Sequence, residues 1–449
     1  MNKDPNRFLF PFYVLVLFVV AAGAIALLWN GAGDTGGWDR KPGEIVFAGW
    51  GGPEEKEVFT HLVREFEREN PEIHVRYIQV PQNYMQKLQI MMAGGTPPDV
   101  FYIPDGDFPA FVVKDTMVPL TPFIEKSDVI NPEEFWPSAL SRYEYDGENL
   151  GKGDIYALPK DIGPFVMYYN KDIFRKAGVP FPSPDVPMTW DEAVAMWQKL
   201  TIPSKEVPGL IDTFGVASFP PEAAVWSNGG EYLSPDRRTF TMPDDPRAIE
   251  GIQWVADLAL KYNCAPSPRQ SASFDPGPMF DTGKLACIFT GRWAVPHFRE
   301  LSFDWDVAPI PVSPRTRKLA GWSGSVGLAM ARDTPNKEAA WKFIEFVAGP
   351  KGQKAQSLQG FQIPNQRWLA KTDVFLQPGK RPEHAEVFIP AALAQRPGIR
   401  NFAPNPQWVD EFLQRINYVW KGDLTAEQGL KRMRPYVQKA LDEAWQEDQ

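Results

Sequence analysis

Histidine and cysteine are scarce in this chain of 449 residues, which contains four histidines and two cysteines. The histidines, His61, His74, His297 and His384, lie far apart and form no His-Glu-x-x-His or Cys/His metal pattern. The sequence also has no Gly-x-x-x-x-Gly-Lys-Ser/Thr segment, so nothing in it predicts nucleotide hydrolysis. We therefore expect no enzymatic activity that depends on a metal or nucleotide, and no cofactor.

Positive charge is also in deficit. The chain has 47 Lys and Arg against 56 Asp and Glu, which gives a net charge of −9 at pH 7. A nucleic-acid-binding protein needs a basic surface, so we expect no nucleic-acid partner. By contrast, the chain contains 16 tryptophans and 45 prolines. Tryptophan suits flat, apolar binding surfaces as well as cores, and proline suits fixed loops around a rigid scaffold.

One long hydrophobic run lies near the N-terminus, from Phe8 to Trp29. As a helix rising 1.5 Å per residue, it would span about 33 Å, close to the hydrocarbon thickness of a bilayer. Lys3 and Arg7 precede the run. By the tendency of positive charge to stay inside, we expect residues 1–7 to be cytoplasmic and the rest of the chain to be exported.

A cleaved signal peptide is the alternative interpretation of this run, because residues 24–26 have the small-x-small form of a cleavage site. The run continues past that site, which favours a retained transmembrane anchor at 8–29. No cysteine lies near it, so it does not predict a lipoprotein anchor. Residues 30–43 are rich in glycine and predict a flexible tether. We thus expect a protein held at the cell membrane with its main domain on the extracytoplasmic side.

The two cysteines, Cys264 and Cys287, leave two interpretations open. Export would permit a disulfide between them. Two unrelated buried thiols are an equally good interpretation, because the sequence does not show whether their Cα atoms come within about 7 Å.

The exported part begins with alternating strand and helix patterns. Short apolar strands are predicted at 44–50, 73–77 and 99–103. Between the first two, apolar residues recur with helical spacing over 53–70, and a second helix is predicted at 82–93. This order predicts parallel strands with right-handed crossovers.

Later segments predict more helices. Thr189 and Glu192 have the spacing of a capping box and predict a helix start. Further helices are predicted at 246–261, 336–348 and 406–420, followed by a terminal helix that Pro435 is expected to interrupt and kink.

Five segments along this part carry characteristic motifs. They are GTPPDVFYIPD at 95–105, YALPKDIGPFVMYYNKDIFRKAGV with PMTWDEAVAMWQKLT at 156–201, WSNGGEYL at 226–233, FDTGKLACIFTGRW at 280–293, and WDVAPIPVSP with AGWSGSVGLAM and PNKEAAWKFIEFVAGPKGQ at 305–353. In this order they resemble the family 1 extracellular solute-binding proteins of sugar-type ABC importers, relatives of maltose-binding protein. The resemblance covers nearly all of residues 44–445.

The resemblance implies an α/β type II periplasmic-binding-protein fold, with two lobes, a hinge and a central ligand cleft. Lobe 1 would comprise 44–160 and 316–350, and lobe 2 would comprise 165–307 and 355–449. The chain would cross between them near 158–165, 308–316 and 349–364. The implied function is non-covalent capture of a carbohydrate or related polyol by a monomer, which delivers it to an ABC permease.

A sugar ring presents apolar faces and hydroxyl groups, so its site needs flat aromatics and planar or charged polar groups. The aromatic candidates are Trp50, Trp226, Trp293 and Trp322. In relatives, aromatics at the last two positions often stack on sugar, and Gly324 lies in a glycine-containing segment whose backbone can approach the ligand. Each tryptophan could instead be a core residue.

The polar candidates are Glu54, Asp105, Asp161 and Arg400, with Asp107 and Arg396 as weaker alternatives. A carboxylate can accept sugar hydroxyls, and a guanidinium can donate in pairs. The competing interpretations are a dipole-favoured helix start for Glu54, a turn for Asp105 and a hinge hydrogen bond for Asp161.

Two other functions fit part of this pattern. A tethered sugar sensor would share the binding motifs and would differ in being read by a membrane receptor. A glycosidase needs two carboxylates facing each other across a glycosidic bond, an arrangement that Glu54, Asp105 and Asp161 could mimic. Neighbouring permease or kinase genes would separate transporter from sensor, and turnover of an aryl glycoside would reveal an enzyme.

Overall fold

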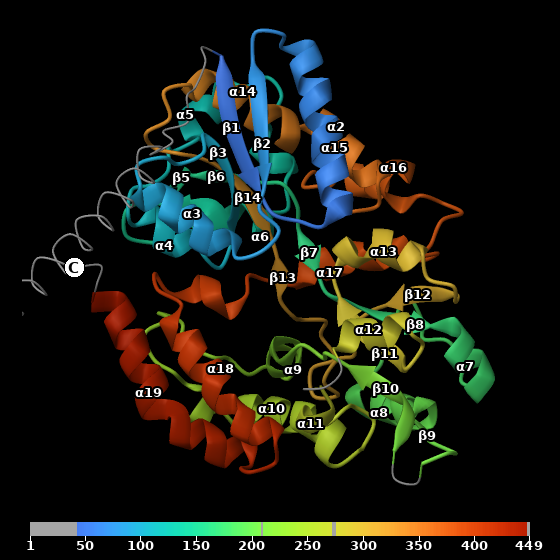
Figure 1. The fold of residues 1–449 in the computed structure, drawn as a ribbon. Coiled ribbons are helices and arrows are strands. Elements are labelled where there is room, and N and C mark those ends of the chain that lie inside the picture. The colour runs from blue at the N-terminus through green and yellow to red at the C-terminus, as the bar shows by residue number, and fades with distance from the viewer. Residues whose placement is uncertain (1–42, 208–209, 272–274, 447–449) are drawn as a thin grey trace, which may run out of the picture.

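The computed structural model describes residues 43–207, 210–271 and 275–446. They form two stacked lobes, each built around a five-stranded sheet (Figure 1). The predicted cytoplasmic segment, membrane-spanning helix and nearly all of the tether lie outside these residues. Within the described ranges, no helix is both long enough and apolar enough to cross a membrane.

The sheet of lobe 1 has the strand order β2-β1-β3-β14-β6. Its strands are β1 (Glu44–Gly49), β2 (His74–Gln79), β3 (Val100–Pro104), β6 (Ala157–Pro159) and β14 (Val326–Met330). β1 pairs in parallel with both β2 and β3, which confirms the predicted strand-helix order. β14 returns from lobe 2 and pairs antiparallel with β3 and β6, so the last part of the sheet comes from distant sequence.

Helices cover the lobe 1 sheet and bury their apolar faces on it. They are α2 (Pro53–Glu69), α3 (Tyr84–Ala93), α14 (Lys337–Ala348) and α15 (Pro350–Leu358). The predicted apolar stripe of α2 is buried, with Phe59 and Phe66 fully so. Phe47 of β1 contacts Phe59 and Phe343, with ring centroids 5.6 and 5.1 Å away. Burying an aromatic side chain of this size contributes roughly 2–3 kcal/mol, so these contacts hold the helices onto the sheet.

The sheet of lobe 2 has the order β12-β8-β11-β10-β9. Its strands are β8 (Val166–Asn170), β9 (Ile202–Pro203), β10 (Ile211–Ala217), β11 (Leu285–Thr290) and β12 (Trp305–Ala308). β10 and β11 are parallel, whereas β8 is antiparallel to β11 and β12. The helices associated with this lobe include α7 (Lys171–Ala177), α8 (Trp190–Leu200), α9 (Pro221–Ser227) and α10 (Pro246–Leu260).

The predicted helix signals of lobe 2 are confirmed. Both hydrogen bonds of the capping box form: Thr189 Oγ1 accepts from Glu192 N, and Glu192 Oε2 accepts from Thr189 N at 2.7 Å. Among the later predicted helices, two correspond to α10 and α18 (Gln407–Trp420), and the third corresponds to α14 of lobe 1. The predicted interruption at Pro435 is wrong, because α19 (Ala426–Gln446) continues through it, whereas the kink expected there stays a prediction. Packing of α19 against α18 and α10 outweighs the lost backbone hydrogen bond.

Short elements complete the described chain. The helices are α4 (Phe108–Val112), α5 (Thr121–Ile124), α6 (Pro137–Leu140), α11 (Pro268–Ser271), α12 (Pro276–Asp281), α13 (Val295–Arg299), α16 (Asp373–Leu376) and α17 (Phe388–Ala394). Short strands β4 (Glu144–Tyr145) and β5 (Asp154–Ile155) form a separate two-stranded ribbon.

Three stretches of chain join the lobes. Two of them pair as a ribbon, β7 (Gly163–Pro164) with β13 (Ser323–Gly324), which lies between the two sheets in Figure 1. The third follows α15 and is pinned to its neighbours: Ile363 bridges to Ile162, and Trp136 Nε1 donates to Pro364 O at 2.8 Å. Because each crossing is hydrogen-bonded to another, the hinge is a connected unit rather than three independent loops.

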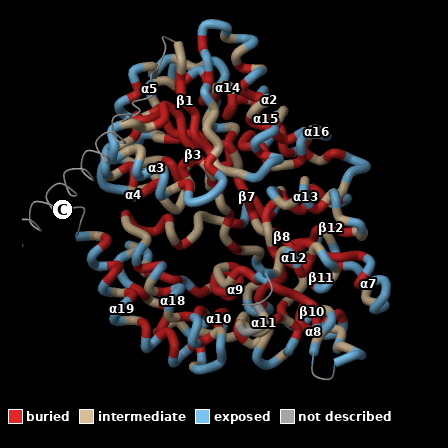
Figure 2. The backbone as a smooth tube through the Cα atoms, in the orientation of Figure 1, coloured by how far each residue is buried: buried red, intermediate tan, exposed pale blue. Residues whose placement is uncertain are grey.

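Burial and charge are distributed differently over the molecule. Buried backbone concentrates in and around the two sheets (Figure 2).

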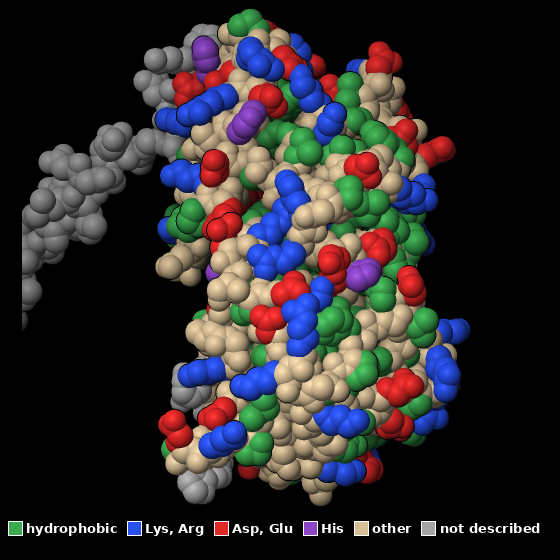
Figure 3. Space-filling model, turned by 90° about the vertical axis from the view of Figure 1, so that its right-hand side faces the viewer, with side chains coloured by type: hydrophobic (Ala, Val, Ile, Leu, Met, Phe, Trp, Pro, Cys, Tyr) green, Lys and Arg blue, Asp and Glu red, His purple; other side chains and the backbone are tan. Residues whose placement is uncertain are grey.

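On the face turned to the viewer in Figure 3, Lys and Arg side chains gather near mid-height, where the lobes meet. The net negative charge is therefore not spread evenly.

The cysteines are both buried and both free. Burial raises the pKa of the Cys264 thiol to about 12 and also raises that of Cys287. A thiol with such a pKa is protonated at neutral pH and is a poor nucleophile. Of the two interpretations that the sequence leaves open, the structure supports two buried free thiols and not a disulfide.

Candidate binding site between the lobes

An aromatic cluster lies where the lobes meet. Phe165 precedes β8, and its ring centroid is 4.6 Å from that of Trp322 and 5.4 Å from that of Trp293. Trp293 is 42% exposed, and the other two rings are half-buried. The three residues come from two crossings and from the segment after β11. The fold thus gathers two of the predicted tryptophans and adds Phe165, which was not among the aromatic candidates from the sequence.

Glycines make room for this cluster. A Cβ at Gly163 would lie 2.7 Å from the Trp293 ring, and one at Gly291 would lie 2.0 Å from it. Gly324 pairs with Gly163 in the β7–β13 ribbon, and a Cβ there would approach the Trp322 ring to 3.3 Å. The rings therefore lie directly against backbone, which only glycine permits. The half-buried backbone at Gly324, beside flat rings, can offer a ligand hydrogen bonds in addition to stacking.

Side chains from the region after α17 fix the cluster from lobe 2. The Gln395 amide makes two hydrogen bonds to the Phe165 backbone, at 2.8 and 2.7 Å. Next to it, Arg396 O accepts from Ser323 N at 3.0 Å. These bonds satisfy backbone groups in the crossings that no sheet partner reaches, and they hold Phe165 and Trp322 in place.

Asp105, at the end of β3, is held in a buried ion pair. Its Oδ2 lies 2.7 Å from Arg142 Nη1, and the Arg142 side chain is fully buried. Arg142 also donates to the carbonyl and, at 2.6 Å, the hydroxyl oxygen of Ser323. Burial raises the pKa of the Asp105 carboxyl, and Arg142 opposes that rise. Nothing in the local sequence marked Arg142, whose partners lie 37 and 181 residues away.

Asp161 is part of a second polar network, centred on Lys160. Lys160 Nζ lies 2.9 Å from Glu55 Oε1 and 3.2 Å from Asp161 Oδ2, and Asp161 Oδ1 accepts from Val326 N at 3.0 Å. Burial acts to lower the pKa of Lys160, but the two carboxylates outweigh it and raise that pKa. Lys160 therefore stays charged. Both oxygens of Asp161 take part in hinge contacts, the alternative that the sequence had left open.

Trp50 and Glu54 lie beside this network with different orientations. Trp50 is half-buried and packs edge-on against Tyr102, 5.0 Å away, whose hydroxyl donates to Glu55 at 3.2 Å. Glu54 is exposed on the first turn of α2. The neighbouring Glu55 is 4% exposed and is the carboxylate that points inward.

Arg400 and its neighbours make direct contact between the lobes. They lie on a short 3₁₀ helix, Ile399–Phe402, of lobe 2. Asn401 Nδ2 donates to Asp105 O at 2.6 Å, and the Arg400 side chain packs on Gly106. The Arg400 guanidinium pairs with Asp410, and its charge counters the rise that burial causes in the pKa of Asp107.

Trp226 belongs to the core of lobe 2 and not to the aromatic cluster. It is 7% exposed on α9 and contacts Tyr232 and Phe402. The Arg396 guanidinium stacks over its ring at 4.0 Å. The structure thus does not bring Trp226 together with Trp293 and Trp322.

Glu222, which the sequence did not single out, is a half-buried carboxylate in the first turn of α9. It has no ion pair or hydrogen bond to a different described residue. Burial raises the pKa of its carboxyl to about 7. Ala223 beside it lies against Gly321, so α9 begins at the edge of the junction.

This pKa predicts a pH-dependent stability. The folded state binds the Glu222 proton more tightly than the unfolded chain, whose pKa is near 4.5. The stabilisation is therefore complete below pH 4.5 and is lost as the pH rises to about 7 and above. The total loss in the free energy of unfolding is at most about 3 kcal/mol. We expect Glu222→Gln to flatten the dependence between pH 5 and 8, measured by urea unfolding at each pH. An unchanged dependence in the variant would show that Glu222 is not its source.

One group of potential metal ligands occurs among the described residues: Asp306, Glu383 and His384, whose ligand atoms lie within 4.8 Å of one another. Their atoms are already engaged. His384 Nδ1 lies 2.7 Å from Asp306 Oδ2, and Lys171 Nζ lies 2.7 Å from Glu383 Oε2. Lys171 already pairs with Glu383, and His384 is bonded to Asp306, so this cluster is better explained as a network of ion pairs and hydrogen bonds.

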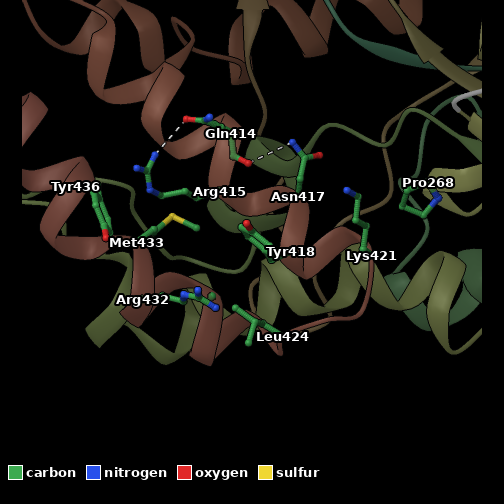
Figure 4. A pocket seen from close by; sticks show the side chains of 11 residues that line it. Pro268, Gln414, Arg415, Asn417, Tyr418, Lys421, Leu424, Arg432, Met433 and Tyr436 are labelled. Carbon is green, nitrogen blue, oxygen red and sulfur yellow. Dashed lines mark hydrogen bonds between the residues drawn. The ribbon is translucent and has the colours of Figure 1, made fainter.

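Cavities also occur in lobe 2, outside the aromatic cluster. One of about 640 Å³ lies between α18 and α19 and is lined by Arg415, Lys421 and Arg432 with Tyr418 and Tyr436 (Figure 4). Another, of about 850 Å³, lies between the segment 231–247 and residues 396–402. The second shares Arg396 with the contacts that hold Ser323 at the junction.

Two α/β lobes joined by a hydrogen-bonded hinge, with half-exposed aromatic rings and backbone at the junction, define a two-lobed periplasmic-type binding protein. The chain matches the model of the bacterial extracellular solute-binding protein family over residues 52–354. It belongs to that family. It is accordingly an extracytoplasmic solute-binding protein and not an enzyme.

Characterised relatives and solved structures support this assignment. The chain is 26% identical to a maltotriose-binding protein of Pyrococcus abyssi. The match covers 70% of this chain and 64% of that protein. It is 24% identical to an arabinooligosaccharide-binding protein of Bacillus subtilis, with 78% of each covered. An ABC substrate-binding protein of Listeria monocytogenes, solved with cycloalternan, matches with a TM-score of 0.77 and 25% identity over 89% of this chain and 98% of that one.

Proposed function

We propose that this protein captures a carbohydrate between its lobes and delivers it to the permease of an ABC importer. The observation that carries the proposal is the aromatic cluster at the junction, in which the Trp293 ring is 42% exposed. Trp293, Phe165 and Trp322 lie together at the junction, beside backbone and charged groups, and the apolar face of a sugar fits such a cluster of rings.

In this proposal, Trp293 and Trp322 stack on the sugar, and the backbone at Gly324 hydrogen-bonds its hydroxyls. Trp50, Glu54, Asp105, Asp161 and Arg400 line the polar part of the site, and Trp226 supports it from the lobe 2 core. The lobes comprise 44–160 with 316–350 and 165–307 with 355–449. The protein acts as a monomer, and residues 8–29 hold it at the membrane.

The similar proteins support a carbohydrate as the ligand class. Two of them are named for maltotriose and arabinooligosaccharides, and one was solved with cycloalternan. These are neutral sugars with several rings. A site with two stacking tryptophans suits a ligand of more than one ring, because each ring can cover one apolar face.

Closure of the lobes supplies the proposed signal to the permease. Asn401 of lobe 2 hydrogen-bonds to Asp105 of lobe 1 at 2.6 Å, so the lobes are already in contact in this structure. A ligand that contacts both lobes stabilises the closed form by its differential affinity for the two forms. No covalent chemistry on the ligand is involved: Asp105 and Asp161, which a glycosidase would need free, are held by Arg142 and Lys160.

Titration calorimetry tests the proposal. The full-length protein is titrated with neutral and acidic mono-, di- and oligosaccharides and with polyols. We expect at least one sugar to bind with a Kd of about 1 μM or tighter, equivalent to about 8 kcal/mol of binding free energy. Silence across the whole panel would contradict the carbohydrate proposal.

A further inference from the structure

The 850 Å³ cavity of lobe 2 is large enough for a sugar-sized group. Its walls come from the segment 231–247, which includes the start of α10, and from residues 396–402. The second wall also contacts lobe 1, since Asn401 reaches Asp105 and Gly398 packs on Trp322. The cavity therefore adjoins the proposed ligand site and shares one wall with it.

The charges that line this cavity are paired, with one exception. Its carboxylates are Glu231, Asp244 and Asp245. Glu231 pairs with Arg396 at 2.5 Å, Asp245 with Arg247 at 2.9 Å, and Asp244 with Arg434 at 2.5 Å. Arg237 also lines the cavity, and no described carboxylate pairs with it. One guanidinium thus remains without a counter-charge.

Arg237 is held in position and faces a second cation. Its backbone N donates to Ser234 O at 2.8 Å, and its carbonyl accepts from Trp445 Nε1 at 3.1 Å. Its guanidinium lies 5.1 Å from the centre of the Phe402 ring. Burial, and then the charge of Arg396, lower the pKa of Arg237. Two guanidinium groups repel each other in this half-buried place, and a bound anion would relieve that repulsion.

Arg396, which lines the same cavity, has a hydrogen-bond donor without an acceptor. Its Nη2 pairs with Glu231, but its buried Nε has no hydrogen-bond acceptor among the described residues. A buried donor without an acceptor costs about 1–3 kcal/mol. That Nε is itself buried, so the feature of the cavity that a bound anionic group would correct is the uncompensated charge of Arg237.

We propose that this cavity is an anion subsite, in which Arg237 binds a carboxylate, sulfate or phosphate group carried by the captured carbohydrate. The inference rests on the proposed function, and it narrows the ligand class to acidic saccharides. The neutral rings lie at the aromatic cluster, and the acidic substituent extends past residues 396–402 into the cavity. Guanidinium is suited to this role because its planar donors match the two oxygens of such a group.

The test compares matched neutral and acidic sugars on four full-length proteins. The probes are glucose and glucuronate, a neutral and a uronate-containing disaccharide, and sodium sulfate as a free anion, each titrated by calorimetry. The proteins are the unchanged chain, Arg237→Gln, Arg237→Lys and Arg238→Gln. Arg238 is the adjacent exposed cation and does not line the cavity, so Arg238→Gln makes the same change in net charge.

We expect an acidic sugar to bind at least tenfold more tightly than its neutral counterpart. Arg237→Gln should remove that advantage and leave neutral-sugar affinity unchanged, Arg237→Lys should keep part of it, and Arg238→Gln should keep all of it. Equal thermal midpoints would establish that the variants are folded. The advantage should also shrink as salt is raised, because chloride and added ions screen the interaction.

Several results would overturn the inference. If Arg237→Gln and Arg238→Gln lost the tighter binding of acidic sugars to the same extent, the cause would be a general charge effect. In a fifth protein, Arg432→Gln, loss of the advantage of acidic sugars would instead place the anion in the cavity of Figure 4. Binding of neutral sugars with no preference for acidic ones would refute the subsite and leave the proposed function standing. Sulfate binding that depends on Arg237, with no sugar bound at all, would support the anion site and refute the carbohydrate function.

Discussion

Replacing Arg142 with Gln is expected to lower the free energy of unfolding by about 3–5 kcal/mol, the range observed when one partner of a buried ion pair is removed. The Arg142 side chain is fully buried and holds Asp105 and Ser323 together. In the variant the Asp105 carboxylate stays buried without its counter-charge, and the Ser323 carbonyl loses a donor. Urea unfolding followed by tryptophan fluorescence measures the change.

Arg175→Gln provides the matched control. Arg175 also makes two ion pairs, with Asp172 and Asp304 at 2.7 and 2.8 Å, but its side chain is 52% exposed. Exposed pairs contribute roughly 0–1 kcal/mol, so this variant should unfold almost as the unchanged protein does. If both variants lost the same small amount, the buried pair would not be what ties β3 to the hinge.

Replacing Trp293 with Ala is expected to weaken sugar binding by about thirtyfold, which corresponds to the roughly 2 kcal/mol cost of truncating a binding hot spot. Trp293 is 42% exposed, so its removal should cost little stability while it takes away one stacking face. Calorimetry with the sugar that binds the unchanged protein best measures the loss.

Trp368→Ala is the control variant. It shows whether loss of sugar binding follows from removal of the stacking ring of Trp293 or from removal of any exposed tryptophan. Trp368 is 46% exposed, close to the value for Trp293, and it lies outside the aromatic cluster. Its indole donates to Glu134 at 2.7 Å. This variant should bind sugar as the unchanged protein does. Unaltered affinity in Trp293→Ala would remove the aromatic cluster from the proposed site.

Predicted elements agreed with the structure wherever the signal was local. The capping box at Thr189 and the apolar stripe of α2 depend on residues within one or two helical turns, and both are as predicted. Pro435 shows the limit of such signals. Proline is unfavourable inside a helix, yet α19 continues because its apolar face packs on α18 and α10. A tertiary contact here outweighs a local preference.

Side-chain direction at the site was harder to predict than the elements that carry it. Adjacent positions on a helix point about 100° apart, so Glu54 is exposed while Glu55 is buried against Lys160. Similarly, Trp226 packs into a core and Trp293 is half-exposed, although both belong to glycine-containing motifs of the family. The motif placed these residues near the junction, and packing decided which of them faces it.

The sequence by itself determined the family, the two-lobed α/β class and most of the helices and strands, because these depend on periodic burial and on ordered motifs within short stretches. Only the tertiary structure decided the partners: Arg142 with Asp105, Lys160 with Glu55 and Asp161, and Phe165 with Trp293 and Trp322. It also decided that Arg237 has no such partner among the described residues. The physical reason is that a charge or an aromatic ring inside a protein is stabilised by whatever the fold brings within a few ångströms. Apart from the adjacent Lys160 and Asp161, those groups lie tens to hundreds of residues apart in the chain.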